Sequence, residues 1–191
     1  MPLVEIDRHG DVTLQLTKNS NGSDDGVRSI LVSSKVIALA SPVFSAMMSP
    51  HFREGQRSTL GTLDPIPLPD DDTEAVTVLC HILHFNYSAL PARADLELFK
   101  NLALLCDKYD CVTPLRFISE QWLLMWEKTA EKKELETLLF ISYIFDRAER
   151  FSALSTRIIK EFTGDLKQLE TLLEFDALPE ELLSTFPDSF V

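Results

Sequence analysis

The pattern of apolar residues changes its period within one stretch, Ile30-Leu31-Val32-Ser33-Ser34-Lys35-Val36-Ile37-Ala38-Leu39-Ala40-Ser41-Pro42-Val43-Phe44. Its first three residues are apolar and favour a short strand. Ser34 can then cap a short helix that carries Val36, Ile37, Leu39 and Ala40. Ser41-Pro42 starts a second helix, with serine as the N-cap and proline at the first helical position. The stretch therefore predicts a strand that leads directly into a pair of helices.

The residues on either side of this stretch predict two more strands. Residues 12–17 alternate apolar and polar side chains, and a polar, turn-rich segment at 19–26 follows them, so residues 11–33 are typical of a hairpin. Downstream, Leu63-Asp64-Pro65-Ile66-Pro67-Leu68-Pro69 places prolines at alternate positions. Because proline donates no backbone hydrogen bond, this strand can pair on one side only and must lie at a sheet edge.

Helices dominate from Asp71 onward. Asp71-Asp72-Thr73-Glu74 resembles a capping box, Asp95 starts a second helix, and Thr113-Pro114 repeats the cap-then-proline start. The apolar residues of these helices recur at spacings of three and four. They are Ala75, Val78, Leu79 and Ile82; Leu98, Leu102, Leu105, Cys106 and Tyr109; and Leu115, Ile118, Trp122, Met125 and Trp126. We expect an α+β fold, a small three-stranded sheet with helices.

The composition changes after Glu127, where a Lys/Glu-rich run to Glu134 indicates an exposed turn or boundary. Amphipathic helical patterns follow over residues 135–145 and 151–162, and Gly164-Asp165 ends the second and caps a further helix. Such helices need a surface to pack against. We therefore expect two parts: an α+β domain at residues 10–126 and an all-helical C-terminal extension at residues 127–191.

The composition excludes several classes of protein. The net charge of −12 and the lack of a Lys/Arg cluster disfavour binding to nucleic acid or to an anionic membrane. Three cysteines in a chain of this length favour reduced thiols, as in the cytoplasm or nucleus. We expect no secretory signal and no membrane span, because the first residues lack a basic region and no apolar run is long enough.

The sequence offers little support for catalysis. Cys80-His81-x-x-His84 is the one cluster of potential metal ligands, but Cys80 points away from His81 on a helix, so a core cysteine with surface histidines is the better interpretation. Asp70-Asp71-Asp72 could bind Mg²⁺, although helix capping explains it with less. No phosphate-binding glycine motif occurs. We expect no enzyme, no catalytic residue, no cofactor and no metal.

Four motifs resemble the BTB/POZ family. Residues 30–44 look like its central signature, a strand running into a helix that ends in Ser-Pro-x-Phe, and three further motifs occur in the family's order. The resemblance covers residues 10–126, is greatest to fungal BTB domain-containing proteins, and implies a module that binds other proteins. The three further motifs are Gly10-Asp11-Val12, Ile66-x-Leu68-x-Asp70-Asp71 and Asp107-Lys108-Tyr109-Asp110.

The chain departs from this family at three places. Ser34 stands where many animal members have histidine. Only about ten residues precede the first core strand, too few for the helix that dimerising members exchange, although Val4 to Ile6 could add a short strand. Cullin-binding members carry a hydrophobic-x-Glu element, and its nearest equivalent, Leu90-Pro91-Ala92, lacks the glutamate.

Six residues are candidates for binding a partner. Met47, His51 and Phe52 surround a loop and are adaptable contact residues, although the methionines can equally complete the core. Leu90 belongs to the cullin-type element that the resemblance implies. Trp122 and Trp126 lie one helical turn apart and either pack against the C-terminal helices or contact a partner.

These observations predict a protein-interaction adaptor of BTB type, which the resemblance links to recruiting targets for a cullin-type ubiquitin ligase. Two alternatives stay open. One is a self-assembling, homodimeric BTB scaffold. The other, of a different class, is an enzyme whose site the sequence does not display.

Overall fold

The structure is a computed structural model that describes residues 3–18, 28–49 and 65–162. The chain divides into two compact units, Met1–Phe117 and Ile118–Val191, each described separately below. The division falls inside a helix, α5 (Val112–Thr129). The boundary predicted after residue 126 lies further along this same helix.

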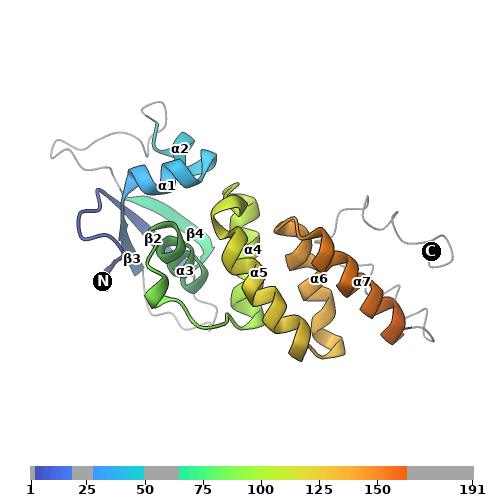
Figure 1. The fold of residues 1–191 in the computed structure, drawn as a ribbon. Helices are drawn as coiled ribbons and strands as arrows, with labels where there is room; N and C mark the ends of the chain where they lie inside the picture. Colours follow the sequence, from blue (N-terminus) through green and yellow to red (C-terminus); the bar gives the residue numbers. More distant parts are fainter. Residues whose placement is uncertain (1–2, 19–27, 50–64, 163–191) are drawn as a thin grey trace. The chain divides into compact units, whose positions relative to one another are not determined.

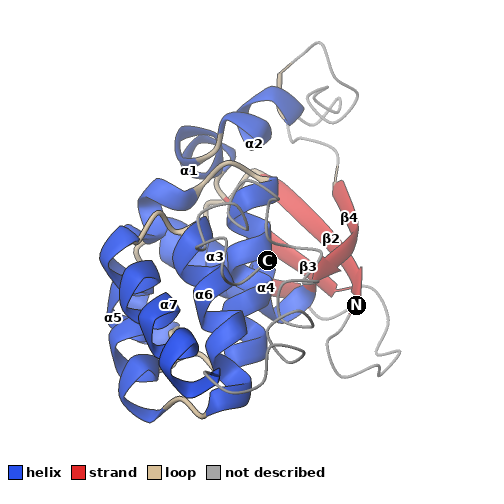
Figure 2. Ribbon diagram, turned by 90° about the vertical axis from the view of Figure 1, so that its right-hand side faces the viewer, coloured by secondary structure: helices blue, strands red, loops and turns tan. Residues whose placement is uncertain are grey.

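The first unit contains a mixed sheet of four strands, β1 (Leu3–Glu5), β2 (Val12–Lys18), β3 (Arg28–Val32) and β4 (Ile66–Asp72) (Figures 1 and 2). Their order is β1-β3-β2-β4. The β2–β3 hairpin is antiparallel, as predicted, whereas β1 pairs with β3 and β4 pairs with β2 in parallel. The expectation of three strands was wrong by one. The fourth strand, β1, pairs with β3 and overlaps Val4 to Ile6, the segment that the sequence indicated could add a short strand.

Side-chain alternation sets the buried face of this sheet. Val12, Leu14 and Leu16 of β2 are buried, while the residues between them are partly exposed. On β4, Ile66 and Leu68 are buried and the prolines beside them are exposed. The strand order places β4 at an edge of the sheet, which confirms the prediction from the proline pattern.

Helices follow the strands in the predicted order. They are α1 (Ser34–Ala40), α2 (Pro42–Met47), α3 (Thr73–Leu83), the 3-10 helix η2 (Tyr87–Ala89), α4 (Leu96–Lys108) and the start of α5. Helix α3 contacts β2, β3 and β4 and so covers the sheet, and α4 packs against α3. This arrangement closes the core of the first unit.

The cap predictions met with mixed success. Ser41 and Asp95 cap α2 and α4 by accepting hydrogen bonds from the backbone three residues on, as predicted. Ser34 does not cap α1, because its hydroxyl donates to Asp11 instead. The cap of α3 is Asp72 rather than Asp71. The Thr113-Pro114 prediction was also wrong, since α5 already begins at Val112.

Asp71 has a different role, in a buried polar joint. Its carboxylate accepts hydrogen bonds from the Tyr109 hydroxyl and from Lys108 Nζ, the latter at 2.6 Å. The Tyr109 carbonyl accepts from Ser41 Oγ, and its ring stacks on Phe44 with centroids 4.3 Å apart. The joint therefore ties β4, α2 and the end of α4 together and satisfies a buried carboxylate.

The described part of the second unit, to residue 162, is helical and contains the rest of α5, the 3-10 helix η3 (Lys132–Glu134), α6 (Leu135–Ile144) and α7 (Ala148–Phe162). Helix α6 is apolar around most of its circumference and is mostly buried, as expected for a central helix. Arg150 of α7 binds Glu120 and Glu127 of α5. The predicted helix after Gly164 lies outside the described residues.

Within the described part of the chain, no helix combines the length and the apolar character that crossing a membrane requires.

Candidate functional site

The C-terminal end of α3 adopts an unusual backbone conformation. The amide of Asn86 bonds the carbonyl of His81 at 2.9 Å, and the amide of Phe85 bonds the carbonyl of Ile82 at 3.0 Å. These two bonds define a Schellman motif, in which the residue after the cap takes a left-handed conformation and is usually glycine. Here that residue is Phe85, with φ of 59°. A bulky residue in this region costs about 1–2 kcal/mol.

Phe85 is also one of the most exposed apolar residues of the described chain. Its side chain is 76% exposed and that of Tyr87 is 53% exposed. The two rings meet edge to face, with centroids 6.4 Å apart. Because a buried phenylalanine contributes about 1.5–3 kcal/mol, leaving it in water while its backbone is strained gives no benefit to folding. We call His84–Leu90 the aromatic loop and take it as the candidate site.

Hydrogen bonds hold the aromatic loop to the rest of the first unit. His84 Nε2 accepts from the Ser33 amide at 3.1 Å, at the junction of β3 and α1. His84 Nδ1 lies 2.8 Å from the carbonyl of Cys80. Asn86 Nδ2 lies 3.1 Å from His81 Nδ1. His81 and His84 are therefore partly buried and make hydrogen-bond contacts, whereas the sequence suggested surface histidines.

One predicted partner-binding residue belongs to this loop. Leu90 ends η2, where its amide bonds the Tyr87 carbonyl at 3.2 Å, and its side chain is half-buried. Met47, at the end of α2, is also half-buried, which fits both a contact role and a part in the core. His51 and Phe52 lie outside the described residues.

The two tryptophans occupy the interior. Trp122 is fully buried and Trp126 is 8% exposed. Their burial fits the packing interpretation and not a contact with a partner, because an indole inside the fold presents no surface.

The thiols of the first unit are also buried. Burial, followed by proximity to Cys111, raises the pKa of Cys80 from 9.0 to about 12. Burial and the contact with Cys111 raise the pKa of Cys106. Because a thiolate is the reactive form, these cysteines act as small apolar residues, as predicted. Among the described residues, no group of three or more His, Cys, Asp or Glu side chains could hold a metal ion.

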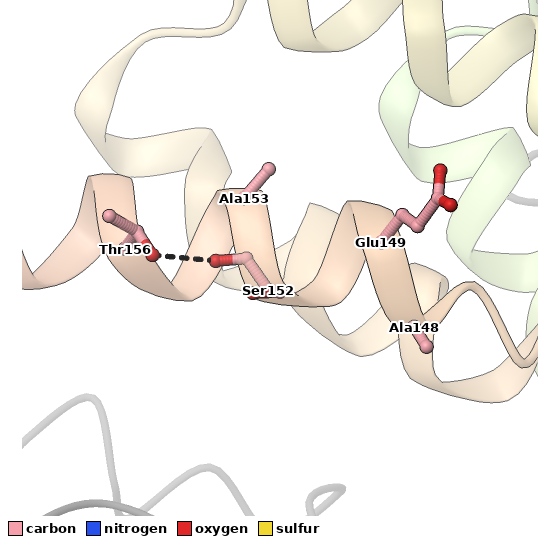
Figure 3. Close-up of a pocket in the computed structure, with 5 residues that line it drawn as sticks. All are labelled: Ala148, Glu149, Ser152, Ala153 and Thr156. Atoms are coloured by element: carbon pink, nitrogen blue, oxygen red, sulfur yellow. Dashed lines mark hydrogen bonds between the residues drawn. The ribbon is translucent and has the colours of Figure 1, made fainter.

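The second unit has an open surface hollow of about 610 Å³ on α7, lined by Ala148, Glu149, Ser152, Ala153 and Thr156. Figure 3 shows that these side chains all come from one helix. The Thr156 hydroxyl donates to the backbone carbonyl of Ser152 at 2.9 Å. A hollow without convergent groups from other elements is not arranged for catalysis.

Sequence reasoning missed Phe85 and Tyr87. The available signal was the pair of aromatic residues directly after the α3 stripe, in a segment of polar turn-forming residues. No protein-family model matches this chain, and no curated protein is significantly similar to it.

Proposed function

We propose that this chain is a protein-interaction module, an adaptor of BTB type that binds a partner protein through the aromatic loop. The observation that carries the proposal is Phe85, which is 76% exposed and held in a strained conformation beside Tyr87. Protein interfaces are enriched in aromatic residues, and a few such residues contribute most of the binding energy. Features that do not favour folding are common at binding sites.

The BTB assignment of the first unit has support from the buried joint. Three motifs that resemble the family contribute to it: Ser41 and Phe44 from the first, Asp71 from the second, and Tyr109 from the third. Residues far apart in the sequence thus satisfy one another in a single cluster. The order of hairpin, helix pair, proline-bearing edge strand and helices agrees with the same assignment.

The side chains of the described residues support an adaptor role more than an enzymatic one. Burial raises the pKa of the Cys80 and Cys106 thiols, so both are protonated at neutral pH. His84 accepts from a backbone amide, and His81 lies within hydrogen-bond distance of the Asn86 side-chain amide. An exposed aromatic pair can bind another protein without any of these groups.

The first experiment is an affinity capture from an extract of the native organism. We expect Phe85→Ser/Tyr87→Ser to lose the captured partner by at least about tenfold, since anchor residues are worth 2 kcal/mol or more. Leu39→Ser is the matched control, because Leu39 is a single apolar side chain, 91% exposed on α1. Equal capture by the double variant and the wild type would rule out the aromatic loop as the site.

Two further measurements separate the forms of this proposal. Binding of a purified cullin N-terminal domain, measured by calorimetry, tests the link to a ligase, and Leu90→Ser should weaken it if the resemblance holds. The mass in solution tests self-assembly. We expect 21.6 kDa at all concentrations, because prolines block strand pairing at the β4 edge and the other edge strand, β1, is only three residues long. A stable dimer would favour the scaffold alternative.

A further inference from the structure

Two histidines at the end of α3 act as hydrogen-bond acceptors. His84 Nε2 faces the Ser33 amide, which can only donate, and its Nδ1 faces the Cys80 carbonyl, which can only accept. These partners require a neutral ring with its proton on Nδ1. The tautomer thus follows from the two backbone groups.

His81 is in a similar situation. Ser88 Oγ donates to Asn86 Oδ1 at 3.0 Å, which leaves Asn86 Nδ2 to donate to His81 Nδ1. His81 and Asn86 occupy the two positions at which a Schellman motif usually has an apolar contact. In α3 that contact is a hydrogen bond to a neutral imidazole, whereas at the end of α4 the same positions hold Cys106 and Cys111.

We propose that the end of α3 is a pH-sensitive latch, which opens when His84 and His81 are protonated and releases the aromatic loop. An imidazolium ion has two N–H donors and no acceptor. Protonation therefore turns the Ser33 contact into two opposed donors. At His81 it requires the Asn86 amide to turn so that Oδ1 accepts, which reverses the hydrogen bond between Asn86 and Ser88. Once these bonds are lost, the strained conformation of Phe85 has less to sustain it. This inference rests on the proposed function in one respect, namely that the aromatic loop is the site that binds the partner protein.

The titratable groups around the latch belong to α3 and to the start of α1. On α3 the titratable neighbours are Cys80 and His81, and burial, followed by the proximity of His84, lowers the pKa of His81. Across the contact, Ser34 donates twice to the Asp11 carboxylate, and Lys35 follows as an exposed residue. Because its pKa is lowered, the His81 ring stays neutral to a lower pH than an ordinary imidazole, and its acceptor contact is lost only as the pH falls below that point.

The first test needs no variant and no partner. Long-range proton–nitrogen correlation spectra of the full chain at pH 7.5 report which ring nitrogen of each histidine carries the proton. We expect His84 with its proton on Nδ1 and His81 with its proton on Nε2. The Nε2–H form of His84 would overturn the proposal, because that ring could not accept from Ser33.

The second test follows the same spectra from pH 7.5 to 5.0. The Ser33 and Asn86 signals should move with the midpoints of the His84 and His81 rings, and protection of the Ser33 amide should fall about fivefold, as expected for one hydrogen bond. His84→Leu should abolish the Ser33 response, and the control His9→Gln, at an exposed histidine of the first unit, should not. A Ser33 signal unaffected by the His84 titration would refute the latch even if partner binding is found, while a responsive latch without partner binding would refute only the proposed function.

Discussion

Phe85 is the residue at which folding and the proposed binding make opposite demands. Glycine takes a left-handed conformation without steric cost, so Phe85→Gly should stabilise the chain by about 1 kcal/mol even though it removes an aromatic ring. The ring contributes little to the fold, because it is exposed and touches Tyr87 only at its edge. Urea unfolding measures the free-energy difference, and affinity capture should show that the stabilised variant has lost its partner.

Phe85→Ala is the control that separates strain from aromaticity. Alanine removes the ring but keeps a Cβ in the left-handed region, so we expect Phe85→Gly to exceed Phe85→Ala in stability by about 1 kcal/mol. If the two variants are equally stable, the backbone at residue 85 is unstrained, and the main argument for a binding role is lost.

At the scale of single helices, α7 completes the end of α5. Arg157 donates from Nη2 to the Ala130 carbonyl at 2.7 Å and from Nη1 to the Glu127 carbonyl at 3.3 Å. The last carbonyls of a helix lack partners within it and attract cations. We expect Arg157→Ala to destabilise the second unit by about 1–2 kcal/mol, with faster amide exchange in α7.

Two variants sharpen this prediction. Arg157→Lys keeps the charge but replaces the two N–H donors of the guanidinium with one compact ammonium group. It should therefore recover only part of the stability that Arg157→Ala loses. Lys128→Ala removes an exposed cation from the same end of α5 and should change stability by less than about 0.5 kcal/mol. A full recovery by lysine would show that charge alone, without the two directed bonds, stabilises this helix end.

The same scale shows what the sequence could predict. Element type and order follow from periodicity, and the β4 edge follows from its prolines, because both depend on local backbone chemistry. The left-handed residues that follow three helices, Phe85, Asp110 and Asp146, were not apparent, since glycine is the usual signal for that position. The roles of Asp71 and His84 depend on Tyr109 and Ser33, which are distant in sequence, and no local pattern reports such contacts.

At the scale of the whole molecule, buried acidic protons make the fold sensitive to alkali. Burial raises the pKa of Cys80 from 9.0 to about 12 and raises that of Cys106, and burial together with the bond to Asp71 raises the pKa of Tyr109. Above about pH 9 the unfolded chain has therefore released protons that the folded chain retains. Stability is complete below this pH and falls as the pH rises, by up to about 1.4 kcal/mol per pH unit for each such group.

Urea unfolding between pH 7 and 11, under reducing conditions, measures this loss directly. Cys80→Ala should be less stable at pH 7, because it leaves a small cavity, but its decline between pH 9 and 11 should be shallower by the contribution of one thiol. A free energy of unfolding that stays constant to pH 11 would mean that the thiols are solvated in the folded chain. The apolar core assigned to α3 and α4 would then be wrong, and with it the rigid base on which the aromatic loop is held.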